Sequence, residues 1–225
     1  MKANGASGVR GHWGLVAGAS MALVVLVALG VLVSLLAHAG VFGSSAAGAV
    51  STTGTGVALS GTDMRRHPAP AFSLLDQNGA TVSLSSLRGR VVVLTFLDAT
   101  CTQQCPIMVQ YLNQTTQFLT PQQVSQVAWV AISVNANNTP AQATAFLAKN
   151  NAAMSMRFLL GSQAQLQPLW KGYYISAQPG LSDVTHTSGL YLIDQQGHER
   201  EWLDAGFDPK GLATDVRTLL GSASQ

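Results

Sequence analysis

Charged side chains are scarce in this sequence of 225 residues, where they make up 10% of the total. No Lys, Arg, Asp or Glu lies between Arg10 and Asp63, and the chain from Asp63 onward holds ten basic and ten acidic residues. The formal net charge of +2 therefore comes from Lys2 and Arg10 alone. The chain has no basic block and no basic stripe interleaved with aromatic residues, which argues against nucleic acid as a partner.

Cysteine is scarcer still, with only Cys101 and Cys105 in the whole chain. Because no cysteine lies near Ala39, a lipoprotein anchor is not supported. The pair is separated by three residues, whereas disulfide oxidoreductases of the thioredoxin type usually carry C-x-x-C. The spacing therefore departs from the commonest redox motif.

The uncharged stretch from Trp13 to Ala37 is rich in Leu, Val and Ala. At about 1.5 Å per residue, a helix of this length crosses the roughly 30 Å hydrocarbon layer of a membrane. We predict a single transmembrane anchor at residues 13–37, with residues 1–12 in the cytoplasm because positive residues favour that side. The alternative is a cleaved signal peptide, for which Ala37-His38-Ala39 resembles a cleavage site. Both interpretations place the remainder of the chain outside the cytoplasm.

Residues 38–66 are dominated by Gly, Ala, Ser and Thr, which predicts a flexible linker. Residues 67–225 then form one domain of typical size. Its pattern alternates between expected strands and helices. The expected strands are Phe72–Leu75, Thr81–Leu84, Val91–Leu97, Val127–Val134, Arg157–Leu160, Gly189–Ile193 and Glu199–Leu203. The expected helices are Pro106–Leu119, Pro140–Lys149, Ser162–Tyr173 and Pro209–Gly221.

This order predicts an α/β sandwich around a mixed sheet, opened by a β-hairpin whose turn contains Asn78-Gly79. The thiol pair lies between the first long strand, Val91–Leu97, and the helix that follows it. That placement resembles the thioredoxin fold.

A structural disulfide is the simplest role for two cysteines outside the cytoplasm. Closing so short a loop stabilises a domain by about 2 kcal/mol, against nearly 5 kcal/mol for a loop of about 100 residues. A disulfide between Cys101 and Cys105 would therefore add little stability.

Pro106 at the first helical position would make Cys105 the N-cap, where the helix dipole lowers a thiol pKa. Thiolates there serve either disulfide exchange or binding of a soft metal such as Cu(I), for which imidazole is a natural third ligand. Asp98 could orient a ligand, or could be a surface residue at the end of the strand.

His186 is the histidine that the sequence favours as a third ligand, because it leads directly into the apolar strand Gly189–Ile193. The alternative for His186 is a hydrogen-bonded loop residue. His12 and His38 flank the membrane segment, while His67 and His198 are expected to be solvated. Met154 and Met156 are expected to pack rather than to bind copper.

The motif C-x-x-x-C-P after a long apolar strand, with a histidine 85 positions after the first cysteine, resembles that of the SCO/SenC proteins. The resemblance covers residues 70–220. Three further stretches are similar: residues 72–79, Ala131–Val134 leading to Thr139-Pro140, and residues 191–197. These proteins are membrane-tethered, thioredoxin-fold copper chaperones for the binuclear copper site of cytochrome c oxidase.

Carried over by position, the resemblance implies that Cys101, Cys105 and His186 bind copper as Cu(I), with Cu(II) as a further oxidation state. It implies a copper-receiving oxidase subunit as partner, together with a copper donor or a thiol-redox protein. The alternative function is a thiol–disulfide reductase in which Cys101 and Cys105 are the catalytic pair; a peroxidase is disfavoured because P-x-x-x-T-x-x-C is absent before Cys101. One departure is the uncharged segment Asn135–Asn138, where many members are rich in Asp, so the docking face is expected to be less acidic.

Overall fold

The computed structural model describes residues 58–152, 155–177 and 188–222. The predicted cytoplasmic segment, the anchor and most of the linker lie outside these ranges, as do His12, His38, Met154 and His186. Among the helices of the described ranges, none has both the length and the apolar character that crossing a membrane requires.

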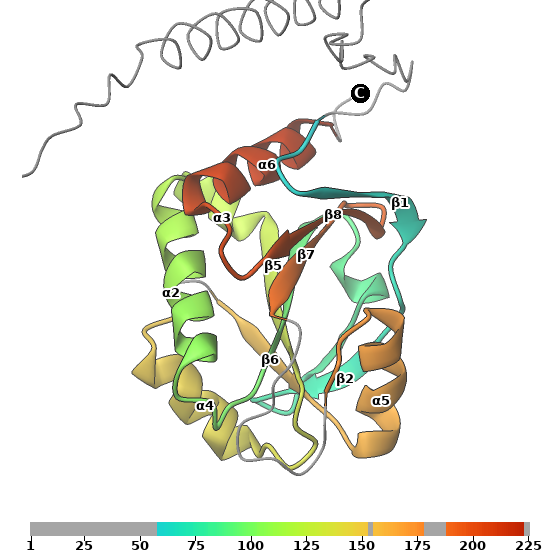
Figure 1. The fold of residues 1–225 in the computed structure, drawn as a ribbon, viewed down its shortest axis with the longest axis vertical. Coiled ribbons are helices and arrows are strands. Elements are labelled where there is room, and N and C mark those ends of the chain that lie inside the picture. The colour runs from blue at the N-terminus through green and yellow to red at the C-terminus, as the bar shows by residue number, and fades with distance from the viewer. Residues whose placement is uncertain (1–57, 153–154, 178–187, 223–225) are drawn as a thin grey trace, which may run out of the picture. The chain divides into compact units, whose positions relative to one another are not determined.

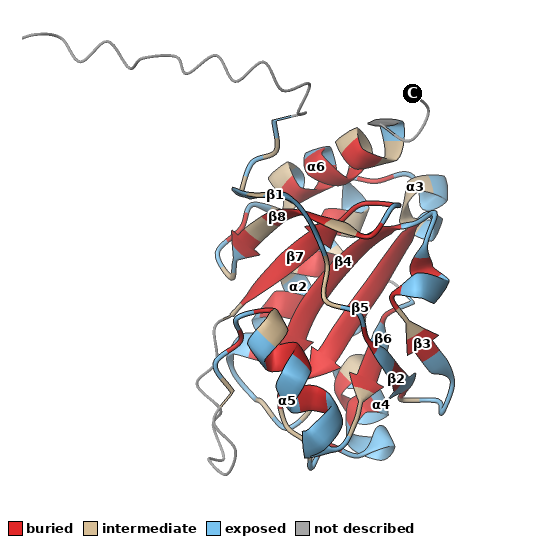
Figure 2. Ribbon diagram, turned by 90° about the vertical axis from the view of Figure 1, so that its right-hand side faces the viewer, coloured by how far each residue is buried: buried red, intermediate tan, exposed pale blue. Residues whose placement is uncertain are grey.

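Within the described residues, eight strands form one mixed sheet at the centre of the domain, in the order β1-β8-β7-β4-β5-β6-β2-β3 (Figure 1 and Figure 2). The strands are β1 (Thr62–Pro68), β2 (Ser73–Asp76), β3 (Thr81–Ser83), β4 (Val91–Leu97), β5 (Val127–Ser133), β6 (Arg157–Leu160), β7 (Gly189–Ile193) and β8 (His198–Asp204). Every residue of β4, β5 and β7 is buried, as expected for apolar strands covered on both faces. Strands β4, β5 and β6 run parallel, and β7 is antiparallel to β4.

Helices cover both faces of this sheet, so that its strands are buried between exposed helical surfaces (Figure 2). The helices are η1 (Ser85–Leu87), α2 (Gln104–Gln117), α3 (Pro121–Ser125), α4 (Pro140–Lys149), α5 (Gln163–Gly172) and α6 (Pro209–Ser222). One core cluster joins α2, α4 and α6 to the sheet, and a second joins α5 and the β2–β3 hairpin to the opposite face. The mixed α/β sandwich that the sequence predicts is confirmed.

The carboxyl ends of β4 and β5 meet at one edge of the sheet, because the two strands are parallel and Leu97 pairs with Ser133. In open α/β sheets, ligands bind beyond the carboxyl ends of such strands. The loop that carries the thiols follows β4, and the loop at residues 134–139 follows β5. The topology therefore brings these two loops together.

Local sequence signals account for several element boundaries. Thr139 caps α4: its hydroxyl accepts from the Gln142 amide, the Gln142 side chain accepts from Thr139 N–H, and Pro140 takes the first turn. Gly79, at a φ of 81°, closes the β2–β3 hairpin in a backbone conformation that glycine adopts without strain. Both features agree with the prediction.

Several predicted boundaries were wrong, among them both ends of α2, which ends at Gln117 and not at Leu119. Helix α2 begins at Gln104, two residues before the predicted start at Pro106. The sheet also begins earlier than His67, because β1 starts at Thr62 and pairs with β8 inside the predicted linker. Strand β1 is almost entirely exposed and therefore lacks the apolar alternation from which a strand is predicted.

A pair of buried carboxyl groups lies where the chain enters the domain. Glu201 of β8 is fully buried, and one of its oxygens accepts hydrogen bonds from Gly61 N–H and the Ser60 hydroxyl. The same hydroxyl donates to Asp215 of α6 at 2.5 Å. Burial, with Asp215 adding to it, raises the pKa of Glu201 to about 7. Burial raises the pKa of Glu199 to about 7 as well.

The wild type is expected to become less stable as the pH rises, and in Glu201→Gln this decrease should be smaller. A carboxyl whose pKa is about 4.5 unfolded and about 7 folded gives stability that is complete below pH 4.5 and is lost as the pH rises through 7. The shift corresponds to about 3 kcal/mol for this group. Urea unfolding of residues 58–225 at pH 4 and pH 8 measures it, with the exposed Asp63→Asn as control. A variant whose stability changes with pH as the wild type does would contradict this expectation.

Candidate metal centre

Both cysteine sulfurs lie at the junction of β4 and α2. Cys105 occupies the first turn of α2 and is 1% exposed, whereas Cys101 in the preceding loop is partly exposed. The Cys105 amide donates to Cys101 Sγ at 3.3 Å, and the Asp98 amide donates to Cys105 Sγ at 3.5 Å. Neither cysteine forms a disulfide. The local backbone thus directs both sulfurs toward the same turn.

The environment of Cys105 differs from the predicted one. The residue lies inside the helix instead of capping it, and its side chain belongs to the core between α2 and the sheet. Burial, with a smaller contribution from the neighbouring Cys101, raises the pKa of the Cys105 thiol well above its ordinary value. The predicted lowering of this pKa was therefore wrong, because removal from water opposes ionisation of the thiol.

Asp98 directly follows β4 and is 3% exposed, so the interpretation as a surface residue was wrong. Its Oδ1 accepts from the Thr100 amide at 2.8 Å, the Thr100 hydroxyl at 2.8 Å and Asn138 Nδ2 at 2.9 Å. Its Oδ2 accepts from Asn135 Nδ2 at 3.2 Å. Burial alone would raise the pKa of Asp98, but these hydrogen bonds outweigh it and hold the pKa below its ordinary value.

Asn138 carries the connection on into the loop after β5. Its Oδ1 accepts from the Ala99 amide at 2.9 Å and from the Ser133 hydroxyl at 2.9 Å. The Ser133 hydroxyl also accepts from the Asn135 amide at 3.1 Å. The asparagines that replace the expected acidic residues therefore fix the thiol loop to the β5–α4 loop through Asp98.

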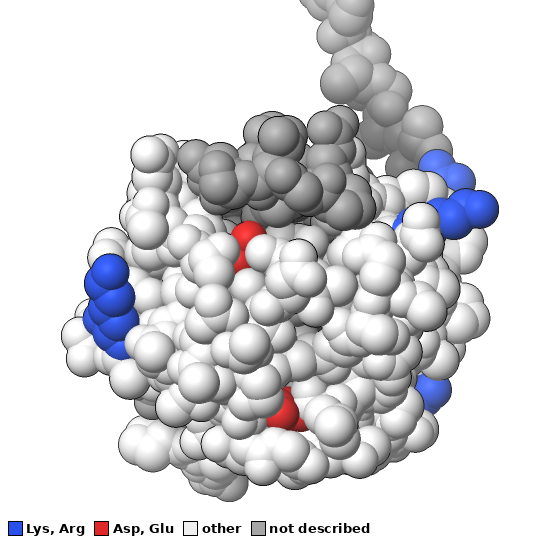
Figure 3. All heavy atoms as spheres, turned by 90° about the horizontal axis from the view of Figure 1, so that it is seen from below, with Lys and Arg blue, Asp and Glu red and all other residues white. Residues whose placement is uncertain are grey.

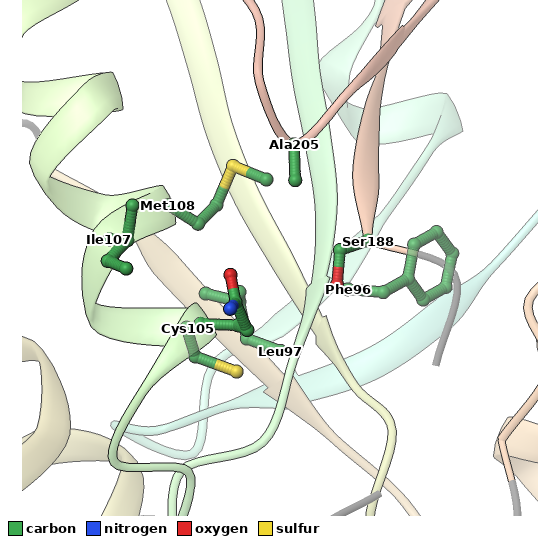
Figure 4. A pocket seen from close by; sticks show the side chains of 8 residues that line it. Phe96, Leu97, Cys105, Ile107, Met108, Ser188 and Ala205 are labelled. Atoms are coloured by element: carbon green, nitrogen blue, oxygen red, sulfur yellow. The ribbon is translucent and has the colours of Figure 1, made fainter. Parts of the chain in front are cut away.

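A small cavity of about 10 Å³ adjoins Cys105 (Figure 4). Its lining comes from β4, α2, the residue before β7 and the residue after β8: Phe96, Leu97, Gln104, Cys105, Ile107, Met108, Ser188 and Ala205. This volume holds about one water molecule. The thiol site is thus bordered by the amino-terminal end of β7, the strand that follows His186 in sequence.

Within residues 58–152, 155–177 and 188–222, no three His, Cys, Asp or Glu side chains are grouped so that they could hold a metal. His67 is exposed in β1, and His198 is partly buried at the start of β8, 3.4 Å from Asp194. Both lie at the end of the sheet away from the thiols, because β8 and β7 pair in antiparallel order back to β4. His186 falls outside the described residues.

Comparison with known proteins identifies the family. The model of the SCO1/SenC family matches residues 61–221, which is most of the chain. The chain belongs to the SCO1/SenC family. The match begins before β1 and ends in α6, so it covers the whole sheet and both thiols.

Individual relatives of this SCO1/SenC chain agree with that assignment. The SCO1 protein homolog of Bacillus subtilis is 26% identical over 141 residues, covering 60% of this chain and 72% of that protein. A structure of Bradyrhizobium japonicum ScoI with copper bound is 24% identical at a TM-score of 0.56, covering 68% of this chain and 99% of that one.

A structure of BsSco, described as having a disulfide switch and as a member of the Sco family of cytochrome c oxidase assembly proteins, is 24% identical. Its TM-score is 0.61, and the match covers 71% of this chain and 97% of that one. These similarities confirm the thioredoxin-like fold of Sco proteins for this chain.

The structure brings together two of the three predicted ligands, Cys101 and Cys105. It also reveals positioning groups that the sequence did not identify as such, Asn135 and Asn138, and the cavity lining from Ile107 and Met108. One signal was available for Asn138: it precedes the cap residue Thr139, directly after a buried parallel strand. The hydrogen bond from Asn138 to Asp98 joins residues 40 positions apart, so no other pattern in the local sequence indicates it.

Proposed function

We propose that this protein binds one Cu(I) ion through Cys101, Cys105 and His186 and delivers it to the binuclear copper site of cytochrome c oxidase. The observation that carries the proposal is the convergence of the two cysteines, joined by a hydrogen bond from Cys105 N–H to Cys101 Sγ. Thiolate sulfur selects Cu(I) among the metals available to proteins, and imidazole is a compatible further ligand. The copper bound to the related ScoI supports the same choice of metal.

The neighbouring groups fit a soft cation with two thiolate ligands. The carboxylate of Asp98 accepts four hydrogen bonds, which leaves the two cysteine sulfurs as the metal ligands at this turn. Cys101 is partly exposed and Cys105 is buried, so an ion held between them is shielded on one side and accessible on the other. Such partial access suits a protein that must release its metal to another.

Chain length supports His186 as the third ligand. Ser188 lines the cavity beside Cys105, and Thr187 alone separates it from His186 in sequence. Two residues of extended chain reach at most about 7 Å. A histidine at position 186 is therefore within reach of the thiol site.

We also propose that residues 13–37 anchor the protein in the cell membrane with the N-terminus in the cytoplasm. The thioredoxin-like domain then lies on the other side of the membrane, outside the cytoplasm. The uncharged, apolar composition of this segment supports the anchor. Because β1 begins at Thr62, the flexible linker of this proposal ends before that residue.

We expect His186→Ala to weaken Cu(I) binding by at least about 10- to 100-fold, the loss that removal of even an outer-shell partner of a metal ligand causes. The measurement is an anaerobic titration of the reduced protein with Cu(I) against a competing chelator. His67→Ala, an exposed histidine at the far end of the sheet, is the matched control and should bind as the wild type does. A wild type without a tight site, or a His186→Ala variant of unchanged affinity, would refute the proposal.

Thiol–disulfide exchange is the second candidate, and the unequal exposure of the cysteines favours it. A partly exposed Cys101 can attack a substrate disulfide, and the adjacent buried Cys105 can then resolve the mixed disulfide. This role predicts reductase activity that survives His186→Ala. The measurement is the rate at which the wild type and His186→Ala reduce a disulfide in the oxidase subunit. Equal rates would favour the reductase function.

A further inference from the structure

An unusually long part of this chain is almost without charge. Between Arg90 and Lys149 the sequence contains a single charged residue, Asp98, and that carboxylate is buried. The stretch comprises β4, α2, α3, β5 and most of α4. Average proteins carry about 25% charged residues, so a surface built from this stretch differs markedly from an ordinary one.

This stretch provides the surroundings of the thiol site. Its exposed residues there are amides, hydroxyls and one large apolar side chain: Thr102, Gln103, Gln104, Ile107, Asn137 and Thr139. We call these six residues the neutral rim. Ile107 is 41% exposed and also lines the cavity beside Cys105 (Figure 4). The first turns of α2 and α4 contain no acidic residue.

Figure 3 looks onto the end of the domain at which β4 meets α2, and most of the described surface there is uncharged. Lys and Arg side chains lie toward the margins of the view, and acidic atoms show as small spots. On the other side of the cavity, the connection from β8 to α6 carries exposed charges at Asp204, Asp208 and Lys210. The neutral rim is therefore the α2–α4 side of the site.

An uncharged rim excludes recognition by long-range attraction. Binding to an anionic membrane surface or to a strongly charged protein requires clustered charges of the opposite sign. Amides and an exposed isoleucine instead favour a partner surface that matches their hydrogen bonds and covers the apolar side chain. Such a surface also avoids burial of unpaired charge.

We propose that the neutral rim is the docking surface for a folded copper-accepting protein whose own surface around the copper site is uncharged. The proposal rests on the proposed function for the identity of the partner. Association depends on short-range contacts at Gln104 and Ile107 and varies little with ionic strength. A charge of either sign placed on the neutral rim weakens docking, because the charged group loses its hydration in the complex and finds no opposite charge on the partner.

The test measures the dissociation constant between the copper-free full-length chain in a neutral detergent and the soluble domain of the oxidase subunit that carries the binuclear copper site. The wild-type value should change by less than about twofold between 20 mM and 500 mM salt, since screening acts on charge pairs. Gln104→Glu and Gln104→Lys should each raise it by about threefold or more, as should Ile107→Ala. Gln122→Glu and Gln122→Lys, on exposed α3, are the matched controls and should leave it unchanged.

Opposite effects of the two Gln104 variants would show a charged partner surface and overturn the inference, as would steep salt dependence or absence of binding by the wild type. These measurements use copper-free protein. Their failure is therefore distinct from failure of the Cu(I) titration, which decides the proposed function.

Discussion

Cys105→Ser should lower the affinity for Cu(I) by about 100- to 1000-fold, the largest effect we expect from a single substitution on binding. Structural zinc sites of four ligands bind with about 10–16 kcal/mol, or about 2.5–4 kcal/mol per ligand, which corresponds to this range. Serine oxygen is a hard donor that Cu(I) does not favour. The hydroxyl can still accept from the Asp98 amide, so the local backbone should be retained.

A variant of the same cavity distinguishes loss of a ligand from disturbance of the core. Met108→Leu conserves volume beside Cys105 and should keep the wild-type affinity for Cu(I). Anaerobic competition titrations of both variants give the comparison, and circular dichroism checks that each is folded. If Cys105→Ser lost less than about tenfold in affinity, Cys105 would not be a ligand.

Regular elements with strong local signals were predictable from the sequence. The apolar runs at Val91–Leu97 and Val127–Val134 predicted the central parallel strands to within one residue, and Thr139-Pro140 predicted the start of α4. Strand β1 could not be found in this way, because all its side chains but that of Met64 are exposed and its place is set by backbone pairing with β8. A strand that is defined by its neighbour leaves little pattern in its own residues.

The candidate site was predictable in its residue types and less so in its environment. The spacing of Cys101 and Cys105 identified the pair, but Pro106 misled the placement of the helix start, since proline is also tolerated later in the first turn. The burial of Cys105 depends on how α2 packs against the sheet, which the local sequence does not contain. For His186, the sequence and the position of Ser188 beside Cys105 support a ligand role, and the titration above decides it.

Asp98→Ala should destabilise the domain by about 3 kcal/mol or more, the largest effect we expect on stability. The substitution removes the acceptor of four hydrogen bonds and leaves polar groups of Thr100, Asn135 and Asn138 without it. A hydrogen bond to a charged group contributes about 1.5–3 kcal/mol, and the buried amide of Asn138 is left without its acceptor. Urea unfolding at pH 7 measures the loss, and a loss below about 1 kcal/mol would show that water replaces the carboxylate.

Exchanging the two side chains of one contact tests the network without creating a cavity. In Asp98→Asn, the amide oxygen can take the position of Oδ1, but its NH₂ group then faces the NH₂ group of Asn135. Asn135→Asp alone sets two carboxylates against each other. We expect each single variant to lose about 1–3 kcal/mol. The double variant should recover most of this loss, because the amide introduced at position 98 can donate to the carboxylate introduced at position 135.

The control for this cycle is Asn137→Asp, an exposed neighbour whose amide N–H, not its side chain, bonds to Asn135. Combined with Asp98→Asn, it should give additive losses, since the hydrogen bonds of the Asp98 carboxylate come from Thr100, Asn135 and Asn138. If the Asp98–Asn135 cycle were additive as well, the two loops would be held by packing and not by this hydrogen bond. Recovery in the double variant would instead show that the carboxylate–amide pair joins the thiol loop to the β5–α4 loop. The pair would do so with the carboxylate at either position.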